Sequence, residues 1–96
     1  MKRQPCVYIL ASKPYGTLYT GVTSSLPQRV WQHKNNVVDG FTKKHFVHEL
    51  VWFEAHETMY SAIAREKHIK AWKRAWKIEM IEDSNPQWND LYESLF

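Results

Sequence analysis

The 96 residues are enough for one domain, and a content of 44% hydrophobic and 24% charged residues is typical of a globular protein. The single cysteine, Cys6, excludes an internal disulfide and fits a reducing compartment. The apolar run after the basic start is too short for a secretory signal, and no run approaches the length of a membrane span. We therefore expect a cytoplasmic protein without a membrane partner.

The distribution of charge is more informative than the formal net charge of +3. The segment 65–77 is rich in Lys and Arg and contains one acid, Glu66, whereas the segment 82–96 contains acids but neither Lys nor Arg. A basic segment beside an acidic end is typical of a surface that binds a polyanion such as nucleic acid. A solvated helix surface has the same composition, so both interpretations stay open.

A β-hairpin is predicted at the start of the chain. Two short runs rich in β-branched and aromatic residues, 6–10 and 19–23, flank a turn with a proline and a glycine. Alternate residues of a strand share a face, so Tyr19 and Gly21 lie on one face of the second run. Tyr8 projects from one face of the first run.

A helix is predicted directly after the hairpin. Ser25 is a candidate N-cap, Gln28 completes a capping box, and Pro27 falls in the first turn. Arg29 and His33 are four residues apart and project from one face of this helix. Two tyrosines, an arginine and a histidine thus converge on the hairpin and the helix that follows it.

A loop and a third strand are predicted next. Residues 35–45 contain the turn-forming residues Asn, Asp and Gly, followed by Lys43 and Lys44, which could reach a phosphate backbone. Residues 49–55 form the strand, and their run of four apolar residues predicts a buried, central position. Pairing of this strand with the hairpin gives a three-stranded sheet.

Three helices are predicted in the rest of the chain, over residues 59 to about 73, 75–82 and 87–95, the last from apolar residues at helical spacing. The predicted fold class is therefore α+β, with a small three-stranded, mainly antiparallel sheet flanked by helices. One domain is expected to span residues 1–96.

Glu66 is an anomaly within the helix predicted from residue 59. The apolar residues of this helix are spaced for one buried stripe, and Glu66 falls on that stripe between Ala62 and Ile63. A carboxylate that points at a core is costly unless it is paired or binds a metal. Glu66 is therefore either a metal ligand or an edge residue that pairs with Lys70 or Arg29.

Several short motifs follow one another in a set order along residues 7–91. They are Val7-Tyr8-Ile9-Leu10, Leu18-Tyr19-Thr20-Gly21-Val22-Thr23, Arg29, Arg65-Glu66-Lys67 and Asn85-Pro86. This ordered set resembles the signature of GIY-YIG nucleases, and in particular their small stand-alone, YhbQ-like branch. The chain departs from the family name with Cys6 in place of Gly and Thr20 in place of Ile, at positions that need no side chain for chemistry.

The resemblance implies a divalent-metal-dependent nuclease that leaves 5′-phosphate and 3′-hydroxyl ends. Glu66 would bind Mg²⁺ or Mn²⁺, and Arg29 would hold a phosphate oxygen as negative charge builds up there. The general base remains open: Tyr19 ranks first, and Tyr8 and His33 follow as positioning or relay groups.

Asn85 matches a family position near the active site, where its amide could orient water or phosphate, although an Asn that simply ends a helix has the same pattern. The expected partner is DNA, with RNA left open, and the chain is expected to act as a monomer without a deducible protein partner. Selection for the shape of the nucleic acid is favoured over selection for its sequence, because the chain has no room for a second DNA-reading domain. The candidate nucleic-acid-binding residues are Lys34, Lys43, Lys44, Lys67, Lys70, Lys73, Arg74 and Lys77. The alternative function is a nucleic-acid-binding module with the same fold and little or no catalysis.

Overall fold

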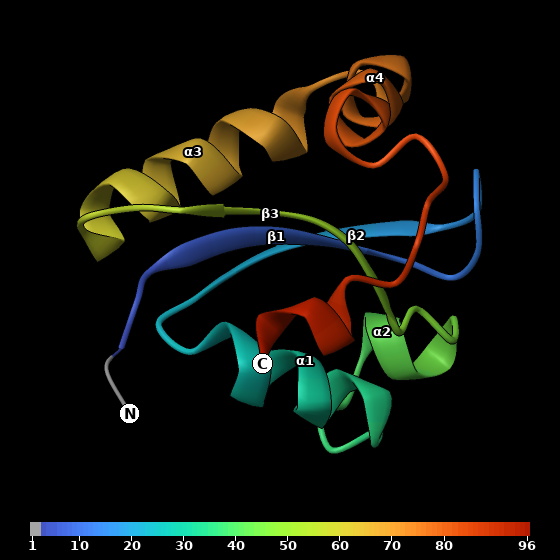
Figure 1. The fold of residues 1–96 in the computed structure, drawn as a ribbon, viewed down its shortest axis with the longest axis horizontal. Helices are drawn as coiled ribbons and strands as arrows, with labels where there is room; N and C mark the ends of the chain where they lie inside the picture. Colours follow the sequence, from blue (N-terminus) through green and yellow to red (C-terminus); the bar gives the residue numbers. More distant parts are fainter. Residues whose placement is uncertain (1–2) are drawn as a thin grey trace.

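The computed structural model describes residues 3–96 and contains one three-stranded sheet. Strands β1 (Cys6–Ala11), β2 (Leu18–Thr23) and β3 (Glu49–Ala55) lie in the order β2-β1-β3, and both pairings are antiparallel (Figure 1). The predicted hairpin and the predicted α+β class are confirmed.

The alternation of β1 divides the core into two layers. Val7 and Ile9 face helices α3 (Met59–Ala71) and α4 (Arg74–Ser84), whereas Tyr8 and Leu10 face helix α1 (Leu26–Lys34). In Figure 1, α3 and α4 lie on one side of the sheet, while α1 and the short helix α2 (Phe41–Lys44) lie on the other. Every residue of β1 is buried, so the central strand is covered on both faces.

The position of β3 differs from the prediction, because β3 is an edge strand and β1 is central. The C-terminal segment covers this edge: the Leu91 backbone amide donates to the Leu50 carbonyl at 2.7 Å, and the Asn85 side-chain amide donates to the Val51 carbonyl at 3.0 Å. A run of apolar residues indicates that both faces of a strand are covered. It does not indicate that both edges of the strand pair with other strands.

The predicted capping box of α1 is wrong. Ser25 is the N-cap residue, but no side chain caps the helix. The Thr23 hydroxyl instead accepts a hydrogen bond from the Ser25 amide at 3.0 Å, which holds the turn from β2 into α1. Pro27 lies in the first turn, as predicted.

Two other segments also depart from the prediction. The predicted loop 35–45 contains the one-turn helix α2, and the predicted helix over 87–95 is reduced to the 3₁₀ turn η1 (Tyr92–Leu95). Trp88 has a φ of 56°, which is incompatible with a continuous right-handed helix. None of the helices within residues 3–96 has the length and apolar character needed to cross a membrane.

Candidate active site

Tyr8 is the centre of the candidate site. Its side chain projects from β1 and is 2% exposed, and its hydroxyl lies 3.0 Å from Nε2 of His33 on α1. Gly21 is opposite Tyr8 in the β1–β2 ladder, and a Cβ added at Gly21 would lie 2.5 Å from both Cζ and the hydroxyl oxygen of Tyr8. The glycine therefore provides the space that the phenol occupies.

Thr42 completes a buried chain of hydrogen bonds. The second ring nitrogen of His33, Nδ1, lies 2.9 Å from the Thr42 hydroxyl, and both side chains are buried. Thr42 belongs to α2, in a stretch predicted as loop. The sequence reasoning missed it because a single threonine beside two lysines carries no pattern that marks it.

Burial favours the uncharged forms of both Tyr8 and His33. Burial, supported by the positive charge of Arg29 and by His48, lowers the pKa of His33 from 6.5 to about 4. Burial also raises the pKa of Tyr8; the neighbouring Tyr19 and Glu66 add to this rise, and Arg29 opposes it. At neutral pH the site thus holds a neutral imidazole beside a protonated phenol.

Tyr19 is the more accessible of the two tyrosines. It is half-buried, and its ring centroid lies 6.3 Å from that of Tyr8 and 5.5 Å from that of His33. The exposed ring of Phe41 stacks on Tyr19 at 6.2 Å. The hairpin and α1 thus bring together Tyr8, Tyr19 and His33, with Arg29 close enough to shift two pKa values.

Glu66 lies on the face of α3 that also carries the buried residues Ala62 and Ile69. The buried stripe is narrower than the sequence indicated, because Met59 and Ile63 are exposed. The Glu66 side chain is 13% exposed, and its Oε2 forms an ion pair with Nζ of Lys70 at 3.0 Å. The pairing with Lys70 that the sequence left open is thus present.

The surroundings of Glu66 fit the divalent cation that the resemblance implies. The Lys70 side chain is 51% exposed, so it can move away from the carboxylate into solvent. Within residues 3–96 no group of three or more His, Cys, Asp or Glu side chains is placed to hold a metal. A lone carboxylate suits Mg²⁺, which keeps several waters and takes further oxygens from a substrate phosphate.

Several of the candidate nucleic-acid-binding residues are engaged within the protein. Arg74 donates to the carbonyls of Tyr15 and Gly16 at 2.6 Å, and Lys34 forms an ion pair with Asp90. Lys43 pairs with Asp39, Lys70 with Glu66, and Lys73 lies over the Trp76 ring. Lys44 and Lys67 are exposed, and Lys77 is partly exposed.

Asn85 ends α4 and is buried. Its side-chain amide group donates to the carbonyls of Val51 and Asn89 and accepts from the Asn89 amide, at 2.9–3.0 Å. These contacts fasten the C-terminal segment to β3. The predicted role of Asn85 in orienting water or phosphate near the active site stays a prediction.

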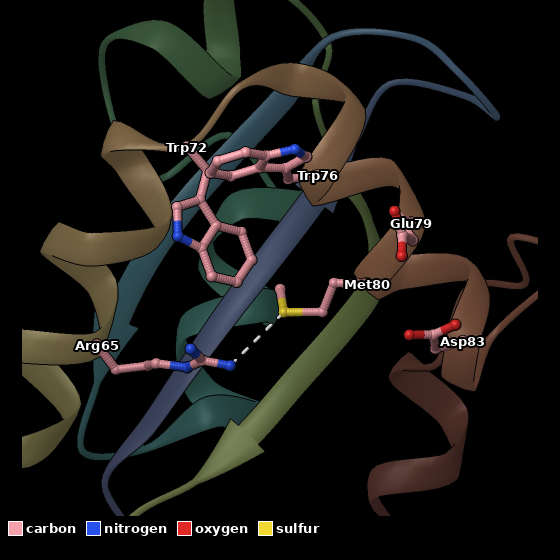
Figure 2. A pocket seen from close by; sticks show the side chains of 6 residues that line it. All are labelled: Arg65, Trp72, Trp76, Glu79, Met80 and Asp83. Atoms are coloured by element: carbon pink, nitrogen blue, oxygen red, sulfur yellow. Dashed lines mark hydrogen bonds between the residues drawn. The ribbon is translucent and has the colours of Figure 1, made fainter.

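A separate cavity of about 400 Å³ lies between α3 and α4 (Figure 2). The Arg65 guanidinium lies over the Trp72 ring at 5.3 Å and forms an ion pair with Glu54 at 3.1 Å. Trp76 and Met80 line the rest of the cavity, with acids at its edge (Figure 2). None of the tyrosines of the candidate site lines this cavity.

Comparison with known proteins gives one family. The family described as the GIY-YIG catalytic domain matches residues 4–79. A UPF0213 protein from Staphylococcus epidermidis is 36% identical over 77 residues, which cover 80% of this chain and 93% of the relative. A UPF0213 protein from Clostridium perfringens is 35% identical and covers 82% and 84% of the two chains.

The fold is also similar to a solved structure, the solution structure of a UPF0213 protein from Bacillus halodurans. The TM-score is 0.58 at 23% identity, and the match covers 94% of this chain and 95% of the other. The match over residues 4–79 and the two relatives together identify this chain as a member of the GIY-YIG family, among the small proteins named UPF0213.

Proposed function

We propose that this protein is a divalent-metal-dependent nuclease that hydrolyses phosphodiester bonds in DNA and leaves 5′-phosphate and 3′-hydroxyl ends. The observation that carries the proposal is the cluster of Tyr8, Tyr19 and His33. The charges of Arg29 and Glu66 both act on the Tyr8 phenol. A packing cluster alone would not require a buried tyrosine–histidine hydrogen bond within reach of the charges of an arginine and a carboxylate.

Arg29 would bind the phosphate. Its guanidinium is permanently charged and planar, so it can hold a non-bridging oxygen as negative charge builds up during attack. No ion pair to a carboxylate engages Arg29 within the described residues 3–96. The guanidinium is therefore available to a substrate anion.

Tyr19 would take the proton from the attacking water. It is more exposed than Tyr8, so a water can reach its hydroxyl. A free tyrosine is a weak base at neutral pH, and nearby positive charge is needed to stabilise its phenolate. The neutral His33 ring accepts or donates at Tyr8 and keeps the buried phenol in place.

Glu66 would hold the divalent cation. When bound, the cation would withdraw charge from the phosphate and stabilise the leaving 3′ oxygen. The half-exposed Lys70 side chain would release the carboxylate and turn toward the phosphate backbone or solvent. This proposal therefore includes an exchange of partners at Glu66.

The test uses labelled branched, single-stranded and duplex DNAs, with Mg²⁺, Mn²⁺ or excess EDTA. We expect metal-dependent cleavage that Glu66→Gln abolishes, whereas DNA binding stays close to that of the wild type. Glu79→Gln removes one exposed acid from α4 and is the matched control. Arg29→Lys keeps the charge but loses the planar fork, and we expect a rate lower by about 10²–10³.

Binding without cleavage of any DNA in either metal would contradict the proposal and leave a binding module. Full activity of the Glu66→Gln variant would remove Glu66 from the metal site.

A further inference from the structure

Arg29 belongs to a second feature, a polar pocket of about 230 Å³ between the end of β2 and the first turns of α1. The pocket is lined by two arginines, by hydroxyl groups and by carboxamides: Arg3, Arg29, Ser24, Ser25, Gln28 and Gln32. Thr23 also borders it, and its hydroxyl is engaged with the Ser25 backbone. No carboxylate among residues 3–96 lines the pocket.

The two guanidinium groups are arranged without a counter-charge. Arg3 donates from Nη1 to the Ser24 hydroxyl at 3.0 Å and keeps its other N–H groups. Neither Arg3 nor Arg29 forms an ion pair within residues 3–96. Two like charges beside one cavity repel each other, and an anion in the cavity would relieve that repulsion.

The donor set identifies the chemistry of the anion. Guanidinium, hydroxyl and carboxamide groups all donate hydrogen bonds, and phosphate offers the several acceptor oxygens that such a set can satisfy. The volume suits one phosphate group with its waters. A carboxylate ligand would use only part of this set.

The position beside Arg29 identifies the source of the phosphate. We propose that this pocket binds a second phosphate of the same nucleic acid strand, next to the one that is cut. This inference rests on the proposed function, because it takes Arg29 as the group that holds the cleaved phosphate. Arg29 would then lie between two neighbouring phosphates, and Arg3 would fix the outer one.

The proposal defines the substrate class. The substrate is a strand that carries a phosphate beside the cleaved phosphodiester, so a single phosphodiester between two nucleosides fills only half of the site. A strand with a neutral methylphosphonate beside the cleaved position should be cleaved about tenfold more slowly or worse, the worth of one charge-assisted hydrogen bond.

The first experiment measures binding without chemistry. The metal-free protein in EDTA is titrated with inorganic phosphate at constant ionic strength, and side-chain amide signals are followed by NMR. We expect the signals of Gln28 and Gln32 to shift. Arg3→Gln should abolish both shifts, and Gln28→Glu should abolish the shift of Gln32. Lys13→Gln removes an exposed positive charge from the hairpin turn and is the matched control that should leave the shift intact.

The second experiment separates a strand phosphate from a free phosphate. Cleavage of an all-phosphate strand is compared with cleavage of the methylphosphonate strand, for the wild type and for Arg3→Gln. We expect each change alone to lower kcat/KM about tenfold and the two together to lower it no further, because both remove one contact. Additive losses, or equal cleavage of both strands, would overturn the inference.

The two experiments also separate the inference from the proposed function. If no strand is cleaved but phosphate shifts Gln28 and Gln32, the proposed function fails and the pocket binds free phosphate only, which overturns the assignment to a strand. If strands are cleaved but phosphate leaves both signals unmoved in the wild type, the nuclease stands and the pocket is not a phosphate site.

Discussion

His33 is held neutral by its place in the fold. It is buried, it contacts the Tyr8 hydroxyl and the Thr42 hydroxyl, and the permanently charged Arg29 is close enough to act on it, with a smaller effect of His48. None of these neighbours compensates a positive imidazole, so the pKa of His33 falls to about 4. The His33 ring therefore stays uncharged around neutral pH, where it can donate or accept the hydrogen bond with Tyr8.

The depressed pKa of His33 predicts a pH-dependent stability. Unfolded His33 binds a proton below pH 6.5 and folded His33 only below about pH 4, so the unfolded state binds more protons between these values. The free energy of unfolding should fall as pH drops through this window, by on the order of 2–3 kcal/mol from this group. Denaturant unfolding at intervals from pH 7 to pH 4 measures the slope.

His33→Gln provides the comparison for that slope. The variant lacks the titrating ring, so its stability should change less than that of the wild type across the same window. Parallel curves for the two proteins would show that His33 titrates normally.

Thr42→Val tests the hydrogen bond between Thr42 and the His33 ring. Valine has the shape of threonine but leaves Nδ1 of His33 without its partner, and an unsatisfied buried polar group costs about 1–3 kcal/mol. We expect lower stability, an altered His33 tautomer signal in NMR and slower cleavage. Thr42→Ser keeps the hydroxyl and should recover the tautomer signal. An unchanged signal in Thr42→Val would reduce Thr42 to a packing residue.

Part of the site was predictable from residue spacing, and part was not. The two-residue period of a strand and the four-residue spacing of a helix are local rules, and they brought Tyr8, Tyr19, Arg29 and His33 to one place. Thr42 reaches His33 only because α2 folds back onto α1, and no local rule describes that contact. The ion pair of Glu66 with Lys70 also follows from a local rule, because residues four apart on a helix are neighbours.

The hairpin is the element that sets the geometry of the site. Its register places Gly21 opposite Tyr8, and the neighbouring strand therefore has no side chain where the phenol lies. A shift of one residue would either bring the side chain of Thr20 or Val22 into that space or turn Tyr8 toward the other core layer. The register of the hairpin and the position of the Tyr8 ring thus depend on each other.

Gly21→Ala tests this dependence. The new methyl group would lie 2.5 Å from Tyr8 Cζ and from its hydroxyl oxygen, and the buried ring has to move. We expect a loss of about 1–3 kcal/mol in unfolding free energy and the loss of the Tyr8–His33 hydrogen bond. Thr17→Ala, at an exposed position of the same hairpin, is the control. Wild-type stability and an unchanged His33 NMR signal would mean that the strand adapts without moving Tyr8.

The elements that sequence reasoning misplaced are those fixed by distant contacts. The edge position of β3 follows from the covering of Leu50 and Val51 by the C-terminal segment, a contact across about forty residues. The same contact explains why the predicted C-terminal helix is reduced to a turn. Its backbone is used to cover the edge of the sheet, and only η1 remains helical.

Across the whole molecule, the basic residues of the predicted nucleic-acid-binding set differ in the contacts they make. Arg74 and Lys34 lie in the predicted nucleic-acid-binding set, yet both form tertiary contacts, with the hairpin turn and with Asp90. Around Arg74, the Tyr15 ring also packs on Trp88 at 4.9 Å, and its hydroxyl bonds to Glu82. Lys67 lies exposed on α3 and is free of such contacts within residues 3–96.

Arg74→Ala and Lys67→Ala should therefore affect different properties, the first stability and the second DNA binding. Arg74→Ala removes two hydrogen bonds from a charged donor to the carbonyls of Tyr15 and Gly16, and we expect it to lower the unfolding free energy by about 1–2 kcal/mol. Lys67→Ala should stay within about 0.5 kcal/mol of the wild type. On duplex DNA, Lys67→Ala should reduce the log–log salt slope of binding by about 0.9, the effect of one lost phosphate contact. Denaturant unfolding and binding titrations at several salt concentrations measure both quantities. A reduced salt slope with unchanged stability in Arg74→Ala would instead assign Arg74 to the DNA-binding surface.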